Sequence, residues 1–219
     1  MACLVLWFAC SGCTAIKDTW RALTGEEEEY SAQELAYVGM DNYESRDYKR
    51  AIEKFEKLKD WFPYSRYAIL AELKIADAHY KLEQYEEAIF AYEEFEKLHP
   101  RNEAIPYVIY QIGRCYFDRI DSVDRDQTPA RKALENFQRL QKQFPNDQYA
   151  RTAADHIHKC YKSLAGNEYI IGIFYYKSKH YKAAYNRFMA VVSEYPDVGY
   201  HQKALQYLSK CEASLVEQQ

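Results

Sequence analysis

Residues 48–63 read YKRAIEKFEKLKDWFP, and this stretch decides the fold because its spacing recurs along the chain. An alanine is followed by an aromatic residue four positions later and by a proline twelve positions later. Four stretches share this spacing: Ala51, Phe55, Pro63; Ala88, Tyr92, Pro100; Ala133, Phe137, Pro145; and Ala184, Phe188, Pro196. Such self-similarity is typical of a helical repeat protein.

Each residue type in this spacing has a physical role in a pair of helices. Positions i and i+4 lie on one face of a helix, so the alanine and the aromatic residue point the same way. The proline ends the second helix because it cannot continue one. A small residue lies twelve positions before three of the alanines, at Gly39, Ala76 and Gly172, and allows the two helices to approach closely. In the third unit the corresponding residue, Gly113, is displaced by an insertion.

The pattern resembles the tetratricopeptide repeat (TPR) and predicts an all-α TPR superhelix, an α-solenoid of about five helix pairs. The predicted helices are 31–45, 48–61, 65–82, 85–98, 104–120, 129–143, 148–164, 167–178, 181–194 and 199–216. They group into repeats at 31–63, 65–100, 104–145, 148–178 and 181–216. The helix at 148–164 falls between two units, so it pairs with either 129–143 or 167–178.

The first 30 residues are separate from the repeats. Residues 2–10 (ACLVLWFAC) are apolar but too short to span a bilayer, and they predict a signal peptide over 1–12. The small residues before Cys13 resemble the lipobox of bacterial lipoproteins, in which the cysteine carries the lipid. Residues 13–30, with the acidic run at 26–29, are then a lipid-anchored tether. The alternatives are an ordinary apolar N-terminus and cleavage without lipid attachment.

Several classes of function find no support in the composition or motifs. A net charge of −4 without a basic domain argues against a nucleic-acid partner. The chain lacks a glycine-rich phosphate loop, an HExxH motif and a nucleophile elbow, so no enzyme activity and no cofactor are predicted. His156 and Cys160 have helical spacing but no further ligands nearby in sequence, so no metal is predicted.

Aromatic residues follow the small residues at a constant distance on the first helix of each pair. We call six residues on this side of the first helices the aromatic row: Tyr43, Tyr80, Tyr107, Tyr110, Phe117 and Tyr176. In a curved array this row lies on the inner surface, where aromatic rings suit an extended peptide. The alternative is that these rings pack between repeats.

The third unit carries an insertion, residues 121–128 (DSVDRDQT), which is either a functional loop or a tolerated surface insertion. Its continuation to residue 133 (DRDQTPARKA from 124), the opening 106–110 (PYVIY), the pair 175–176 (YY) and the stretch 184–187 (AYNR) resemble the BamD family. Members of this family are TPR lipoproteins of the outer-membrane β-barrel assembly machinery.

The resemblance implies a non-enzymatic protein at the periplasmic face of the outer membrane. Its partners would be BamA, through the POTRA domains, other Bam lipoproteins, and unfolded outer-membrane proteins received by the N-terminal repeats. The residues that correspond to family features are the BamA-binding group Arg187, Asn186 and Tyr185 and the loop Asp124, Arg125 and Asp126. A local ion pair is the alternative role for Arg187. The alternative family is another periplasmic TPR protein, such as a CpoB/YbgF-like cell-envelope coordinator.

Overall fold

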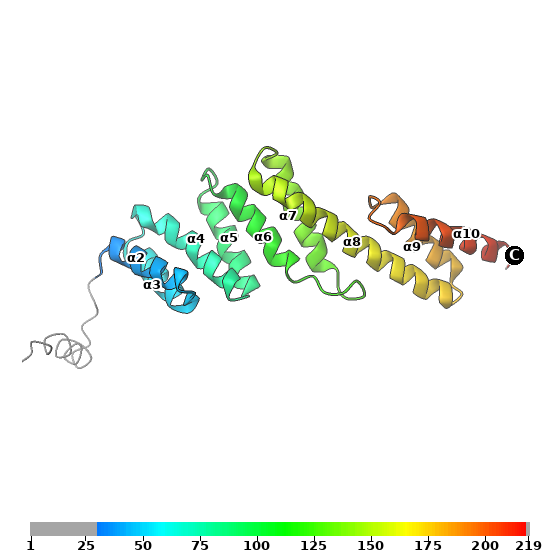
Figure 1. Ribbon diagram of the computed structural model, residues 1–219, viewed down its shortest axis with the longest axis horizontal. Coiled ribbons are helices and arrows are strands. Elements are labelled where there is room, and N and C mark those ends of the chain that lie inside the picture. The colour runs from blue at the N-terminus through cyan, green and yellow to red at the C-terminus, as the bar shows by residue number, and fades with distance from the viewer. Residues whose placement is uncertain (1–29, 218–219) are drawn as a thin grey trace, which may run out of the picture.

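The computed structural model describes residues 30–217, which form nine α-helices and no strand. The helices are α2 (Ala32–Glu44), α3 (Tyr48–Trp61), α4 (Arg66–Lys81), α5 (Tyr85–Leu98), α6 (Ile105–Phe117), α7 (Thr128–Gln143), α8 (Gln148–Lys177), α9 (Tyr181–Ser193) and α10 (His201–Glu217). Each helix packs against the next in sequence order, and Figure 1 shows them stacked along one long axis. The predicted all-α repeat array is confirmed.

Glycine beneath an aromatic ring sets the distance between the paired helices. A Cβ atom added to Gly39 would lie 2.6 Å from the ring of Phe55, and the same distance separates Gly113 from Phe137 and Gly172 from Phe188. The three phenylalanines are fully buried. No larger residue fits at these positions without displacing the ring, so the repeat spacing marks the contact that holds each pair together.

The turns between paired helices repeat as well. Arg46, Glu83 and Lys179 each have a positive φ, 63°, 60° and 60°, and each lies two residues before the tyrosine that opens the second helix. A left-handed residue reverses the chain within one tight turn. Across each turn two tyrosine rings meet, with centroid distances of 5.3 to 5.9 Å: Tyr43–Tyr48, Tyr80–Tyr85 and Tyr176–Tyr181.

The predicted break between 148–164 and 167–178 is wrong. Residues Gln148–Lys177 form one helix of 30 residues. Gly166 lies inside it because the helix is closely approached there: an added Cβ would be 2.9 Å from the Tyr200 hydroxyl and 3.2 Å from Val123. The first half of α8 packs against α6 and α7 and the second half against α9, so 148–178 is not a helix pair of its own.

The buried residues form three hydrophobic clusters in series. The first lies in α2, α3 and α4, the second and largest spans α4 to α8, and the third joins α9 and α10 with the end of α8. Within residues 30–217, no helix has the length and apolar character needed to cross a membrane. Cys13 and the predicted tether lie outside the described residues.

Candidate partner-binding surfaces

Five members of the aromatic row are half-buried, and the sixth is in the core. Tyr110 is only 7% exposed, packed against Phe137 and against Tyr149 of α8, with ring centroids 5.8 and 5.4 Å away. The expectation that Tyr110 lines an open groove is therefore wrong. The first half of α8 covers this face of α6, a contact that the repeat spacing does not reveal.

Polar and cation–π contacts anchor two of the half-buried rings of the row, Tyr80 and Tyr43. The Tyr80 hydroxyl donates to Asp118 Oδ2 at 2.5 Å and accepts from Arg114 Nη2 at 2.8 Å. The Lys74 ammonium lies 4.8 Å from the centroid of Tyr43, whose pKa burial raises to about 12. These contacts hold the two rings in place while each ring stays partly exposed, and an extended chain could contact the exposed part.

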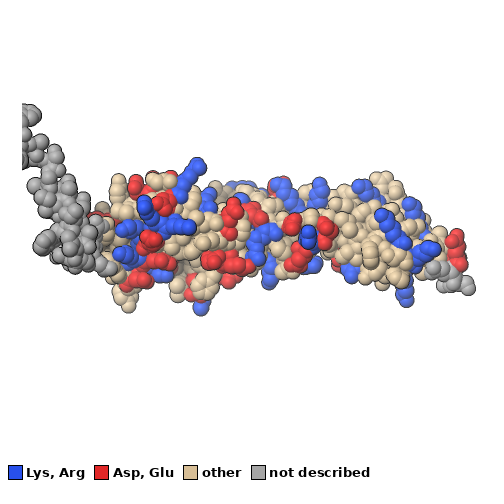
Figure 2. Space-filling model, turned by 90° about the horizontal axis from the view of Figure 1, so that it is seen from below, with Lys and Arg blue, Asp and Glu red and all other residues tan. Residues whose placement is uncertain are grey.

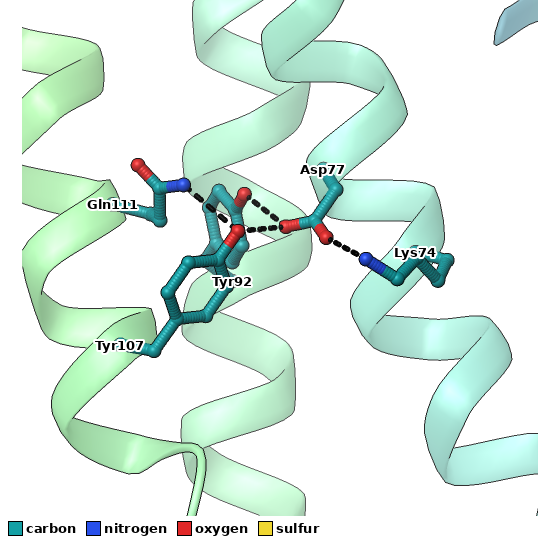
Figure 3. Close-up of polar contacts among 5 residues, drawn as sticks. All are labelled: Lys74, Asp77, Tyr92, Tyr107 and Gln111. Carbon is teal, nitrogen blue, oxygen red and sulfur yellow. Dashed lines mark hydrogen bonds and ion pairs between the residues drawn. The ribbon is translucent and has the colours of Figure 1, made fainter. Parts of the chain in front are cut away.

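A buried carboxylate joins the second and third repeats, and the sequence patterns missed it (Figure 3). Asp77 is 2% exposed, and its Oδ1 accepts from the hydroxyls of Tyr92 and Tyr107, both at 2.7 Å. Its Oδ2 accepts from Lys74 Nζ at 2.7 Å, and Gln111 donates to Tyr107 at 2.8 Å. Burial, followed by the charge of Asp77, raises the pKa of both tyrosines. The Tyr107 hydroxyl is thus occupied by its hydrogen bond to the buried Asp77.

The loop that carries Asp124, Arg125 and Asp126 is fastened to the middle of α8. Gln127 is 3% exposed and donates to the carbonyl oxygens of Ser122 and Arg125, at 3.2 and 3.1 Å. Its own side-chain oxygen accepts from Ser163 of α8 at 2.7 Å. The loop is therefore an ordered part of the scaffold.

The three predicted loop residues themselves face solvent. Asp124 accepts from the Ser122 hydroxyl at 2.5 Å, and this bond lowers the Asp124 pKa. Asp126 accepts from the backbone N–H of Thr128 at 3.1 Å and from its hydroxyl at 2.9 Å, and these bonds lower the Asp126 pKa. Among residues 30–217 no carboxylate pairs with Arg125. The loop thus presents its guanidinium outward, available to a partner.

Arg187 and Asn186 lie together at a hollow between α8 and α9. The hollow has a volume of about 410 Å³ and is lined by Glu168, Tyr175, Ala183, Asn186, Arg187, Ala190 and Glu194. Arg187 Nη1 donates to Glu168 Oε2 at 2.9 Å, with the two side chains 42% and 15% exposed. This hydrogen bond raises the pKa of Arg187. The local ion pair considered from the sequence is present, and the guanidinium remains accessible beside it.

Tyr185 lies apart from its two neighbours. It packs against the C-terminal hydrophobic cluster and lines neither this hollow nor the one that adjoins it. The adjoining hollow, of about 500 Å³, shares Tyr175 and Asn186 and adds Lys179 and Lys182. The structure therefore groups Asn186 and Arg187 with Tyr175 of α8, a neighbour that the spacing along α9 could not indicate.

Of the two residues with helical metal-ligand spacing, Cys160 lies in the core and His156 is half-buried against aromatic rings. The His156 ring stacks edge-on against Phe117, with centroids 4.6 Å apart, and burial lowers its pKa. Burial raises the pKa of the Cys160 thiol to about 12. In the described part of the chain, no three His, Cys, Asp or Glu side chains are grouped to hold a metal ion.

Comparison with known proteins agrees with this architecture. Residues 28–219 match the YfiO family, described as an outer membrane lipoprotein. The outer membrane protein assembly factor BamD of Neisseria meningitidis serogroup A is 31% identical over 191 residues, which are 83% of this chain and 72% of that protein. BamD of Rickettsia prowazekii is 31% identical over 204 residues, or 93% of this chain and 79% of its own length. BamD of Caulobacter vibrioides is 32% identical over 178 residues, covering 81% and 58%. The chain belongs to the BamD family of outer membrane protein assembly factors.

Proposed function

We propose that this chain is a non-catalytic, lipid-anchored subunit of the machinery that assembles outer-membrane proteins, acting at the periplasmic face of the outer membrane. Its C-terminal hollow binds the POTRA region of BamA, and its N-terminal repeats receive unfolded barrel proteins. Membership of the BamD family, whose relatives are outer membrane protein assembly factors, supports a role in this assembly. The exposed Arg187 at the α8–α9 hollow supports the contact with the larger partner.

The hollow suits an acidic partner surface. The Glu168 carboxylate holds the Arg187 guanidinium in place from one side, and an arginine has five donors in a planar fork, so a partner carboxylate can bind the remaining edge. Lys179 and Lys182 lie at the adjoining hollow. On the face in Figure 2, basic side chains outnumber acidic ones over the C-terminal part of the array. Such a surface steers acidic partners toward it.

Charge reversal at Arg187 tests this contact. Arg187→Glu places a like charge beside Glu168 and removes the donors, so we expect binding to the BamA periplasmic region to weaken by at least about tenfold. Isothermal titration calorimetry measures the affinity, and circular dichroism checks the helical content. Lys162→Glu is the matched control, an exposed cation on α8 outside the hollow. Unchanged affinity in Arg187→Glu, or an equal loss in the control, would contradict the proposed contact.

The proposed anchor and client site have separate tests. Cys13→Ala should move the protein from the membrane fraction to the soluble periplasmic fraction; retention in the membrane without BamA would contradict a lipid anchor at Cys13. Peptides that end in phenylalanine should crosslink to photoreactive residues placed at Tyr43 or Tyr80, since both rings are half-buried on the first helices. Labelling only on the second helices of the repeats would contradict the client site.

A further inference from the structure

A cleft opens between α3 and α5, with α4 as its floor. Its volume is about 540 Å³. Glu72, Ile75 and His79 of α4 line the floor, and side chains of α3 and α5 line the walls. The walls are the second helices of the first two repeats. The cleft is therefore distinct from the aromatic row, which lies on the first helices, and from the hollow at Arg187.

The cleft exposes large apolar side chains that the fold does not use. Phe90 is 67% and Leu98 58% exposed, and both lie on α5 beside the buried Phe95 and the half-buried Ala91. In helix α5 these residues occupy one side over two and a half turns, from Phe90 to Leu98. Exposed aromatic and aliphatic groups gathered at a concave surface are typical of a protein-binding site.

The rim of the cleft carries more acidic than basic side chains. Five glutamates line it against a single lysine, Lys59. Three of them have a partner: Glu72 bonds His99 at 2.6 Å, Glu86 pairs with Arg119 at 2.7 Å, and Glu94 is 3.5 Å from Lys97. The other two, Glu56 and Glu87, form no ion pair with any residue in 30–217. The charges of Glu56 and Glu87 are thus left for an incoming cation.

We propose that this cleft binds an amphipathic helix of another protein, with bulky apolar residues on one face and Lys or Arg residues along its flanks. The apolar face would cover Phe90 and Leu98, and the basic flanks would meet Glu56 and Glu87 on the opposite walls. The lining runs along α5 from Glu86 to Leu98, about 18 Å at 1.5 Å per residue, which matches about 12 helical residues. A trough between two helices is a common receptor for a third helix. This inference does not depend on the proposed function.

The first test uses the full-length protein and a fluorescent peptide of about 12 residues that carries leucines at helical spacing and lysines on both flanks. Fluorescence anisotropy should show saturable binding that weakens with added salt. A peptide with glutamate in place of lysine should bind at least about tenfold more weakly, because it meets the acidic rim with like charge. Equal binding of the two peptides would overturn the proposal.

Substitutions in the cleft test its apolar side chains and its acidic side chains separately. Phe90→Ala should weaken lysine-peptide binding about fivefold or more, and Glu56→Lys with Glu87→Lys about tenfold, without loss of helical content, because these side chains face solvent. Glu93→Lys is the matched control: it reverses an exposed charge on the same helix outside the cleft and should leave affinity unchanged. Loss in the control equal to that in the cleft variants would overturn the site.

The occupant in the cell envelope is identified by a photoreactive residue at position 90. The crosslinked segment, mapped by mass spectrometry, should belong to another protein and carry Lys or Arg beside apolar residues at helical spacing. A crosslink to residues 1–29 of the same chain, to a second copy, or to an acidic segment would overturn the proposal.

Discussion

At the scale of single residues, the second repeat departs from its neighbours in a correlated way. Where the other units pair glycine with phenylalanine, this unit has Ala76 and Tyr92, and the added hydroxyl needs a partner when it is buried. Asp77 supplies that partner and in turn needs several donors, because a buried carboxylate loses its hydration. The result is a polar connection between α4, α5 and α6 (Figure 3).

Loss of one of the hydroxyl donors that bind Asp77 should lower the stability of the fold. In Tyr92→Phe the ring still fills its space but a hydrogen bond to a buried charge is lost, so we expect the free energy of unfolding to fall by about 1.5–3 kcal/mol. Urea denaturation monitored by circular dichroism measures it. Tyr64→Phe removes a hydroxyl from a fully exposed ring and should change nothing measurable. A loss in Tyr92→Phe as small as in the control would mean that the Asp77 network contributes no stability.

His156 should make stability depend on pH. Burial against aromatic rings lowers its pKa below 6.5 in the folded chain, so the unfolded chain binds a proton first as pH falls. The stability that the neutral His156 ring contributes is therefore complete above pH 6.5. It is lost as the pH falls through the lowered pKa that His156 has in the folded chain. Between pH 7 and 5, urea denaturation should show a smaller loss of stability in His156→Phe than in the unmodified chain. A loss of stability in His156→Phe as large as in the unmodified chain would contradict this role of His156.

At the scale of elements, α8 has an unusual position. Its first half packs against α6 and α7 and its second half against α9, and the loop between α6 and α7 crosses its middle. Asn167 Nδ2 donates to the Val123 carbonyl at 2.6 Å, next to Gly166, where Tyr200 also approaches. The loop is therefore fastened to α8 at the point where the helix passes through Gly166.

Loss of the Asn167 side chain should loosen the loop and not the helix. In Asn167→Ala the Val123 carbonyl loses its donor, worth about 1 kcal/mol, so amide hydrogen exchange in residues 121–126 should become about fivefold faster. Exchange within α8 should stay slow. Asn136→Ala is the matched control, since that amide bonds the carbonyl of Lys132 within its own helix. Faster exchange along α8 would show instead that the loop bond holds the helix together.

At the scale of the whole molecule, the chain is a row of clusters and not one core. In such an array each repeat is stabilised only by its neighbours. Within residues 30–217 the two terminal clusters each have a neighbouring cluster on one side, so the same substitution should have different consequences at the end and in the middle. This places the proposed BamA contact, on α9, in a part of the molecule that can open independently.

Two substitutions that each create a cavity, one in the middle cluster and one in the C-terminal cluster, test the serial arrangement of the clusters. Phe137 and Phe188 are both fully buried over a glycine, and replacement of either by alanine should cost about 3–5 kcal/mol locally. In Phe188→Ala, hydrogen exchange followed by mass spectrometry should show loss of protection in α9 and α10 while α2 to α5 stay protected. In Phe137→Ala the loss should spread through α6, α7 and α8. Uniform loss along the chain in Phe188→Ala would contradict a serial array.

The prediction of pairs succeeded where its basis was local. The glycine, the alanine, the aromatic residue and the proline are close in sequence, and helix geometry determines which of them share a face. Even the displaced Gly113 was recognised, and its ring partner, Phe137, is the residue found in the structure. The loop 121–128 was located by the same spacing, although its attachment to Ser163 was not foreseen.

The sequence by itself determined the all-helical class, the helix pairs of the first three repeats and the place of the inserted loop, because each follows from contacts between residues a few turns apart. Only the tertiary structure decided that α8 is continuous, that Tyr110 is covered, that Arg187 meets Glu168, and that an acidic cleft opens between α3 and α5. These features depend on how separate helices pack, and side-chain burial and ion pairing across helices follow from that packing and not from periodicity along the chain.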